Sequence, residues 1–335
     1  MKRSLMCVLL ALVVTSVGFG QTALKFTLDW AYQGPQAPFL VALTKGYFAA
    51  EGLNVIIDRG YGSAGAVSQI AGGAYDLGYA DINSMIEFNI ANPDQALISI
   101  AMVLDYAPFS IVTLKAKGIV SPKDLEGKSI GAPAGDASRR LFPLFAASVG
   151  IDLGRIGEWT TMEPALRELL LIQGQVDAVS AHFFTAVLNL KAAGVPEDQV
   201  DVFLYADYGL DLYGNAVMCS PKLLREKPEA VRAFLRALTR AWHDTIADPD
   251  EAIRILQQRD PLIDPAVEKD RLLLAINRCM LTPDVRALGF GDVAMGRLER
   301  AIETVVEAFG LPVVPSACSV FTGAFLPPRG DRIPR

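Results

Sequence analysis

The order of apolar and polar positions predicts an α/β protein. From residue 21 onward, short runs rich in β-branched and aromatic residues alternate with longer segments of helical periodicity. The first strands are predicted at 24–30, 53–58, 76–81 and 96–104, with helices over 37–52, 64–73 and 82–92 between them. Because right-handed crossovers connect parallel strands, this alternation predicts a largely parallel sheet covered on both faces.

A second α/β unit follows the stretch 109–115. Its predicted strands are 128–133, 175–181 and 200–207, with helices starting at 137 and 183, and four or five further helices are predicted between 221 and 309. The late helices have no sheet of their own, so we expect them to pack on the first lobe. The stretches 109–115 and 212–218 then become crossover strands between lobes. The sequence predicts one lobe of residues 21–110 and 213–335, a second of 111–212, and a cleft between them that closes on a ligand.

The first twenty residues have the order of a secretory signal peptide. Lys2 and Arg3 precede an apolar run over 5–17, which ends at the small residues Gly18 and Gly20. This run is shorter than the ~20 residues that span a bilayer. We therefore predict cleavage after Gly20, release of a chain that is not inserted in the membrane, and a periplasmic location.

Charge and cysteine content exclude several classes of function. The 31 basic residues are outnumbered by 37 acidic ones, giving a net charge of −6, which excludes a general binder of nucleic acid or anionic membrane. Beyond the signal peptide, Cys219, Cys279 and Cys318 lie far apart in apolar contexts, without metal-ligand spacing. We predict three buried thiols, with one disulfide plus one free thiol as the alternative, and neither metal nor cofactor.

Two glycine-containing turns are candidate ligand sites. The first, at Gly60, Gly62 and Gly65, has GxGxxG spacing, which is compatible with a dinucleotide site, a plain helix cap, or close approach of the backbone to a small ligand. We favour the last, because the turn lies after the second strand rather than the first. The second turn is PAGDAS, 133–138. Facing helix N-termini at these turns would suit an anionic group.

Aromatic and polar residues at predicted strand ends complete the candidate site, because α/β sheets bind ligands there. Trp30 is predicted either to stack on the ligand or to lie in the core, and His182 either to donate to the ligand or to be structural. Tyr208 and Asp211 lie at the second crossover, where they could equally form the hinge. The predicted ligand-binding residues are Trp30, Tyr32, Gln33, Ser63, Ala64, Asp81, Asn83, Tyr106, Gly135, Asp136, Ala137, Ser138, His182, Phe183, Tyr208 and Asp211.

Five segments in consistent order carry a family resemblance: LDW, FLVALTKGYFAAEGLNV, GSAGAVSQIAGGAYDLGYAD, SPKDLEGKSIGAPAGD and LIQGQVDAV. They resemble solute-binding proteins of bacterial ABC importers, in the branch that holds NMT1/Thi5-like and sulfonate- or taurine-binding proteins. The resemblance implies a type II periplasmic-binding-protein fold and a monomer that delivers its solute to a membrane permease with its ATPase.

The resemblance leaves open the identity of the solute and two alternatives to the transport function. The solute is expected to be a small planar molecule: a pyrimidine-type thiamine precursor, an aromatic acid or a sulfonate. A receptor for a sensor kinase would use the same fold. A pyrimidine-precursor synthase is an enzyme of the same superfamily, but its cysteine-rich iron-binding motif is not found in this sequence.

Overall fold

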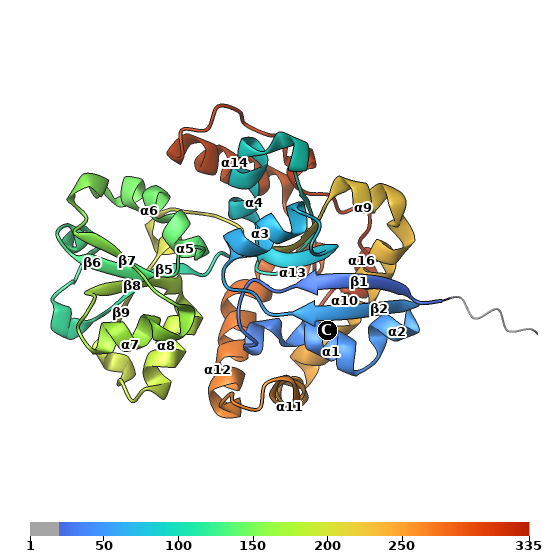
Figure 1. Ribbon diagram of the computed structural model, residues 1–335, viewed down its shortest axis with the longest axis horizontal. Coiled ribbons are helices and arrows are strands. Elements are labelled where there is room, and N and C mark those ends of the chain that lie inside the picture. The colour runs from blue at the N-terminus through green and yellow to red at the C-terminus, as the bar shows by residue number, and fades with distance from the viewer. Residues whose placement is uncertain (1–19, 335) are drawn as a thin grey trace, which may run out of the picture.

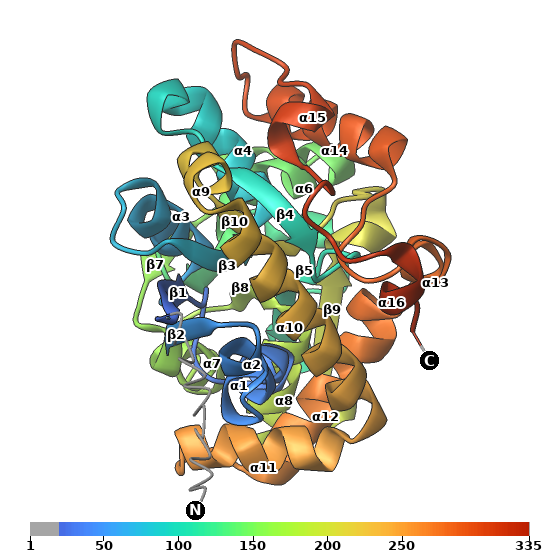
Figure 2. The same ribbon diagram turned by 90° about the vertical axis from the view of Figure 1, so that its right-hand side faces the viewer.

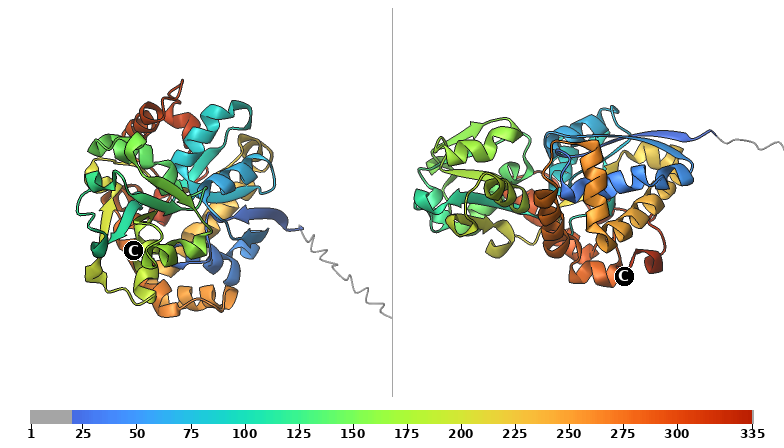
Figure 3. Two further views of the ribbon diagram at one scale, coloured as in Figure 1. Left: turned by 60° about the vertical axis from the view of Figure 1, so that its left-hand side comes forward. Right: turned by 90° about the horizontal axis from the view of Figure 1, so that it is seen from below.

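Two five-stranded sheets organise residues 20–334, the part of the chain that the computed structural model describes. Each sheet is the centre of an α/β lobe, and the two lobes lie side by side (Figures 1 and 3). The predicted signal peptide lies outside the described residues except for Gly20.

Lobe 1 is built on a sheet of order β2-β1-β3-β10-β4. Its strands are β1 (Thr22–Thr27), β2 (Leu53–Asp58), β3 (Leu77–Asp81), β4 (Ile98–Met102) and β10 (Asn215–Cys219). β1 pairs in parallel with β2 and β3, whereas β10 runs antiparallel to both of its neighbours. The predicted parallel arrangement is confirmed for four strands; β10 is reversed because it enters the sheet from lobe 2.

Most of the chain after residue 220 forms helices that belong to lobe 1. The helices of this lobe are α1 (Ala37–Thr44), α2 (Tyr47–Ala50), α3 (Ser63–Ala71), α4 (Ile82–Ala91), α9 (Pro221–Glu226), α10 (Pro228–Ala247), α11 (Pro249–Arg259), α12 (Pro265–Ala275), α13 (Pro283–Leu288), α14 (Met295–Ala308), α15 (Ala317–Val320) and α16 (Arg329–Arg332). Six α-helices lie between 221 and 309, one more than the predicted maximum. The long α10 packs on α1 and α2, as predicted (Figure 2). Phe234 of α10 stacks on Phe26 and Phe48 in the core.

Lobe 2 has a sheet of order β7-β6-β8-β5-β9. Its strands are β5 (Phe109–Leu114), β6 (Ser129–Ala132), β7 (Glu158–Thr161), β8 (Ala178–His182) and β9 (Val200–Leu204), and its helices are α5 (Ala137–Arg140), α6 (Phe142–Val149), α7 (Arg167–Ile172) and α8 (Phe183–Ala192). β5 is its reversed strand, antiparallel to β8 and β9. Each lobe therefore has one reversed strand. It is the strand that the chain forms directly after it has crossed from the other lobe.

The chain passes between the lobes through 103–108 and 209–214. The first segment precedes the predicted crossover 109–115, and the second overlaps the start of the predicted crossover 212–218. The rest of each predicted crossover forms a strand, β5 or β10, that lies within one sheet, so Phe109 and Ser110 pair in lobe 2 rather than lobe 1. The connecting segments bond to each other: the Gly214 N–H donates to the Leu104 carbonyl at 2.9 Å and the Ala107 N–H to that of Leu212 at 3.1 Å. They therefore form one paired hinge.

The three cysteines of the described residues are free thiols. Cys219 and Cys279 are buried, and burial raises the pKa of each thiol to about 12. Cys318 is exposed, so the prediction of three buried thiols is wrong at this position. Cys318 follows the start of the one-turn helix α15, whose Ala317 and Val320 are the residues that face inward.

Candidate functional site

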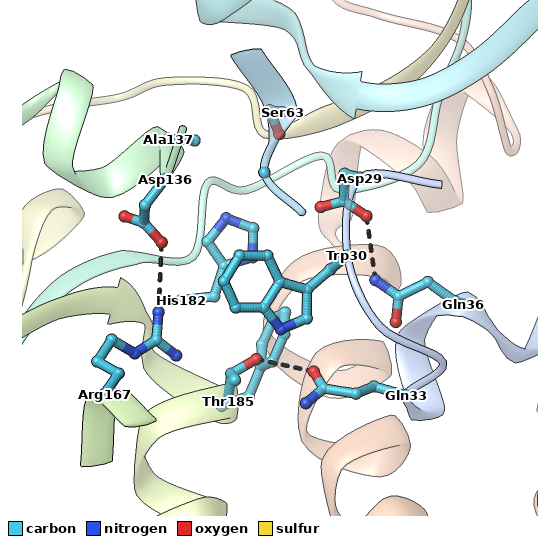
Figure 4. Close-up of a pocket in the computed structure, with 12 residues that line it drawn as sticks. Asp29, Trp30, Gln33, Gln36, Ser63, Asp136, Ala137, Arg167, His182 and Thr185 are labelled. Atoms are coloured by element: carbon cyan, nitrogen blue, oxygen red, sulfur yellow. Dashed lines mark hydrogen bonds and ion pairs between the residues drawn. The ribbon is translucent and has the colours of Figure 1, made fainter. Parts of the chain in front are cut away.

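A small pocket lies between the lobes, at the carboxyl ends of β1 and β8 (Figure 4). This edge of a parallel sheet is where ligands bind in α/β folds. Its lining residues are Asp29, Trp30, Gln33, Gln36, Gly62, Ser63, Asp136, Ala137, Arg167, His182, Phe184 and Thr185. The first six come from lobe 1 and the rest from lobe 2, so anything bound here contacts both lobes.

Trp30 supplies the flat apolar surface of the pocket. It follows β1 in the chain, and its indole faces the Arg167 guanidinium of lobe 2, whose central carbon is 5.4 Å from the ring centroid. The ring is half-buried rather than part of the core. The Arg167 cation therefore lies over one face of the indole in a cation–π contact between the two lobes.

Arg167, at the start of α7, is the cation of the pocket and is 1% exposed. Its Nε donates to Glu168 at 2.8 Å, and its Nη1 lies 3.3 Å from the Asp136 carboxylate. Its Nη2 has no partner among the described residues. Figure 4 shows the guanidinium directed from lobe 2 toward the indole of Trp30. A buried donor without a partner is unfavourable, so this N–H is available to a ligand.

Asp29 and Gln36 form the lobe 1 wall. The Asp29 carboxylate accepts hydrogen bonds from Gln36 Nε2 at 3.2 Å and Asn215 Nδ2 at 2.7 Å, and burial raises its pKa to about 6. Because a carboxylate accepts and cannot donate, the amide nitrogen of Gln36 faces Asp29. The carbonyl oxygen of Gln36 is left buried and without a partner in the part of the chain that the structure describes.

His182, at the end of β8, is a neutral side chain in this pocket. Burial, and then the charge of Arg167, lower its pKa to about 3. Burial raises the pKa of Asp136, against the opposing effect of the Arg167 charge. The histidine therefore offers one donor and one acceptor and no charge near pH 7.

The lobes touch around the pocket. Gly62 at the start of α3 lies against Gly135 of lobe 2, and the Ala64 N–H points at the Gly135 carbonyl, 3.4 Å away. Thr185 Oγ1 donates to Gln33 Oε1 at 3.1 Å, and Arg271 of α12 donates to the Thr185 carbonyl at 3.0 Å. The structure therefore shows the cleft closed.

The hinge is held by one buried arginine of α14. Arg297 donates to the backbone carbonyl of Asp105 at 2.9 Å and, through Nε, to the Asp211 carboxylate at 2.7 Å. Its guanidinium lies between the rings of Tyr106 and Tyr213, 4.6 and 4.1 Å from their centroids. Both connecting segments are thus attached to the same side chain.

The family is decided by a match between residues 34–252, more than half of the chain, and the model described as NMT1/THI5 like. The chain belongs to the NMT1/THI5-like family. It is 29% identical over 87% of its length, and 82% of the relative's, to the riboflavin-binding protein RibY of Chloroflexus aurantiacus. It is 25% identical to the 4-amino-5-hydroxymethyl-2-methylpyrimidine phosphate synthase of Legionella pneumophila, covering 90% and 91% of the two chains.

Solved structures share the fold of this NMT1/THI5-like protein. The alkanesulfonate-binding protein SsuA from Xanthomonas axonopodis pv. citri superposes with a TM-score of 0.69 at 18% identity, over 90% of this chain and 99% of that one. The predicted periplasmic-binding-protein fold and the predicted family are confirmed.

Six of the predicted ligand-binding residues line the pocket: Trp30, Gln33, Ser63, Asp136, Ala137 and His182. The Ser63 hydroxyl accepts from the Asp81 N–H at 3.1 Å, so its own proton is free to be donated. Of the two interpretations offered for Trp30, the structure supports the pocket over the core.

The predicted pair of helix N-termini does not form an open anion site in this structure. Ala64 and Gly135 lie at the contact between lobes, where the Ala64 N–H faces the Gly135 carbonyl. α5 is a single turn, and its Arg139 N–H donates to the Asp136 carboxylate at 2.9 Å. Donors expected to meet an anionic ligand are therefore already paired within the protein.

Five other predicted residues lie outside the pocket walls. Tyr32 accepts from Arg259, and Asp81 caps α4 by accepting from the Ser84 N–H. The rings of Phe183 and Tyr208 pack edge-on against Phe184 and Phe145. The backbone carbonyl of Ser138 accepts from the Tyr205 hydroxyl, and its own buried hydroxyl has no partner among residues 20–334.

Asn83, Tyr106 and Asp211 belong to the hinge or its supports. Asn83 Nδ2 donates to the Tyr213 carbonyl at 2.7 Å, and Arg297 contacts the other two. For Asp211, the structure favours the hinge alternative.

Six pocket residues are absent from the predicted list: Asp29, Gln36, Gly62, Arg167, Phe184 and Thr185. Of these, Gly62 belongs to the first of the two glycine-containing turns proposed as ligand sites. Asp29 lies inside the LDW segment that carried the resemblance, and its place after a buried strand was the available signal. Arg167 gave no signal, because RELLLI has the pattern of an ordinary amphipathic helix with its arginine toward solvent. Its burial depends on Asp136 and Glu168 being placed beside it by the fold.

Proposed function

We propose that this protein is the solute-binding subunit of a bacterial ABC importer, capturing a small planar organic solute between its lobes and delivering it to a membrane permease. The observation that carries the proposal is the shared pocket, with Trp30 of lobe 1 facing Arg167 and His182 of lobe 2. A solute held by both walls binds the closed state better than the open one, so binding drives closure. The paired hinge at 103–108 and 209–214 allows that motion.

The pocket walls support a flat organic solute. The Trp30 indole and the Phe184 ring line the pocket together with single polar groups, a combination of side chains typical of sites for small organic molecules. The names of the relatives contain riboflavin and a methylpyrimidine phosphate, both built on flat heteroaromatic rings. The candidates are therefore a pyrimidine or flavin type of ring, an aromatic acid or an aryl sulfonate.

Binding is favoured over catalysis because the relatives and solved structures of similar fold include proteins named for binding, RibY and SsuA. With a pKa of about 3, His182 is a poor proton carrier near neutral pH, whereas Asp29, with a pKa of about 6, lies closer to the range of a general base. Among residues 20–334, no three His, Cys, Asp or Glu side chains gather as metal ligands would. The synthase named among the relatives makes a biosynthetic enzyme of the same fold the second candidate.

The periplasmic location and the permease partner rest on the predicted signal peptide and on the SsuA-like fold. No helix of the described residues is long and apolar enough to cross a membrane. A receptor for a sensor kinase would share these features and is distinguished by its partner protein.

A solute screen on the purified protein tests the proposal. Thermal-shift measurements over pyrimidines, flavins, aromatic acids and sulfonates should find a stabilising class, because a ligand of the folded state raises the midpoint as its concentration exceeds Kd. Hits are checked by calorimetry, by incubation for turnover, and by uptake in cells that lack the gene. Binding without turnover, together with uptake that the gene restores, is expected; conversion of the hit to product would instead establish the enzyme.

A further inference from the structure

Arg167 and Gln36, on opposite walls of the pocket, each have one buried polar atom that finds no hydrogen-bond partner among residues 20–334. Arg167 Nη2 of lobe 2 is a donor, and Gln36 Oε1 of lobe 1 is an acceptor. Figure 4 shows these side chains on either side of the Trp30 indole. Buried polar groups are nearly always hydrogen-bonded in folded proteins, so a donor and an acceptor left open in one pocket define what the missing partner must offer.

The charges around the pocket restrict that partner further. Two carboxylates, Asp29 and Asp136, line it against the single guanidinium of Arg167, which is already paired with Asp136 and Glu168. An anionic solute would meet two like charges and a cation whose charge is already neutralised. Burying an unpaired charge is strongly unfavourable.

We propose that Arg167 and Gln36 determine the specificity of the site: Arg167 Nη2 donates to an acceptor of the solute, Gln36 Oε1 accepts from an N–H or O–H of the same solute, and the solute is uncharged. This assignment rests on the proposed function and selects among its candidates. It favours an aromatic ring bearing an amide or amino group over an aromatic acid or a sulfonate. Because one hydrogen bond comes from each lobe, the solute itself bridges the cleft.

Matched amide and acid pairs test the assignment by calorimetry. The compounds are the carboxamides and carboxylates of benzene, pyridine and pyrimidine, which share shape and differ in charge and in the N–H donor. For the best-bound ring, the amide should bind roughly 10- to 100-fold more tightly than the acid. An acid that binds as tightly as its amide overturns the assignment, and so does the failure of every amide to bind.

Variants of lobe 1 separate the roles of the residues. Gln36→Met removes the open acceptor and should lower the amide-to-acid affinity ratio about 10-fold. Gln33→Met is the matched control: its Oε1 already accepts from Thr185, so both compounds should shift together. Asp29→Asn offers an N–H to Gln36, turning the amide of Gln36 so that its NH₂ faces the pocket; the preference should fall or reverse. An unchanged ratio in Gln36→Met overturns the role of Gln36.

The role of Arg167 is tested by changing the donor in the protein and, separately, the acceptor in the solute. Arg167→Lys keeps the charge but lacks Nη2, and should weaken the amide about 10-fold while circular dichroism shows a folded protein. If that variant does not fold, the thioamide of the same ring gives the answer, since sulfur is a poor acceptor and should bind about 10-fold more weakly than the amide. Equal affinities for amide and thioamide overturn the role of Arg167. A sulfonate hit in the wider screen, with no amide binding here, would remove this inference and leave the proposed function standing.

Discussion

Gly62 and Gly135 approach so closely across the cleft that a Cβ on Gly62 would lie 2.5 Å from the Gly135 carbonyl oxygen. Gly62 also has φ +131°, a backbone conformation that other residues rarely adopt. The closed arrangement of the lobes therefore depends on a missing side chain in lobe 1. Glycine at position 62 is therefore required both for the local turn and for closure of the two lobes.

Gly62→Ala is expected to weaken solute binding about 10-fold or more, because the added methyl group holds the lobes apart. Gly65→Ala is the control, since nothing lies within 4 Å of its Cβ position on the same helix and the substitution should slightly stabilise α3. Calorimetry with a hit from the solute screen measures both. If Gly62→Ala binds like the wild type, the contact does not limit closure.

Trp30→Ala should weaken binding of the same solute by about 1–3 kcal/mol and move the unfolding midpoint of the empty protein by only a few degrees. The reason is that the ring is half-buried at the pocket wall. Trp159→Ala provides a matched comparison, because this tryptophan packs edge-on against Phe142, 5.2 Å away within lobe 2. Trp159→Ala should lower the unfolding midpoint and leave the affinity for the solute unchanged. If Trp30→Ala instead lowers the midpoint strongly and leaves the affinity unchanged, Trp30 is a structural residue.

Arg297→Gln is expected to loosen the hinge. The substitution leaves the buried Asp105 carboxylate, 3.2 Å from Arg297 Nη1, without its ion-pair partner, and loss of one member of a buried pair typically costs about 3–5 kcal/mol. Hydrogen exchange should rise in both 103–108 and 209–214. Arg300→Gln, on the exposed side of the same helix, should change neither exchange nor stability. Faster exchange in only one segment would argue against a shared anchor.

Asp29 should contribute a measurable pH dependence to stability. Its pKa is raised to about 6 by burial, so between pH ~4 and ~6 the folded protein holds a proton that the unfolded chain has released. Its contribution is full below about pH 4 and is lost as the pH rises through 6, amounting to at most about 3 kcal/mol. His182, with its lowered pKa, acts in the opposite direction over part of this range.

The measurement is therefore a comparison of urea unfolding for the wild type and Asp29→Asn at pH 4 to 7. The wild type should gain stability relative to the variant as the pH falls. A difference in the free energy of unfolding that stays constant over this range would show that Asp29 titrates normally in the folded state.

The alternation of strands and helices was sufficient to predict the two lobes, because local periodicity reports which faces are buried. The direction of a strand could not be predicted from local periodicity: β5 and β10 are reversed because the chain changes lobes just before them. In the site, Trp30 and His182 could be predicted from their positions after strands. Asp211 could not be assigned to the hinge, since its partner Arg297 is 86 positions away. Arg167 could not be found at all, because one of its two carboxylate partners, Asp136, lies 31 positions earlier in the chain.

The strand order of lobe 1 determines when its sheet can be completed during synthesis of the chain. β4 joins the sheet only through β10, which pairs on its other side with β3. Until residue 219 has been synthesised, β3 and β4 each lack a neighbour and expose a strand edge. Lobe 2 has all five of its strands by residue 204. The sheet of the N-terminal lobe is therefore completed after that of lobe 2, and a nascent protein that ends before β10 carries two open edges that are prone to non-native pairing.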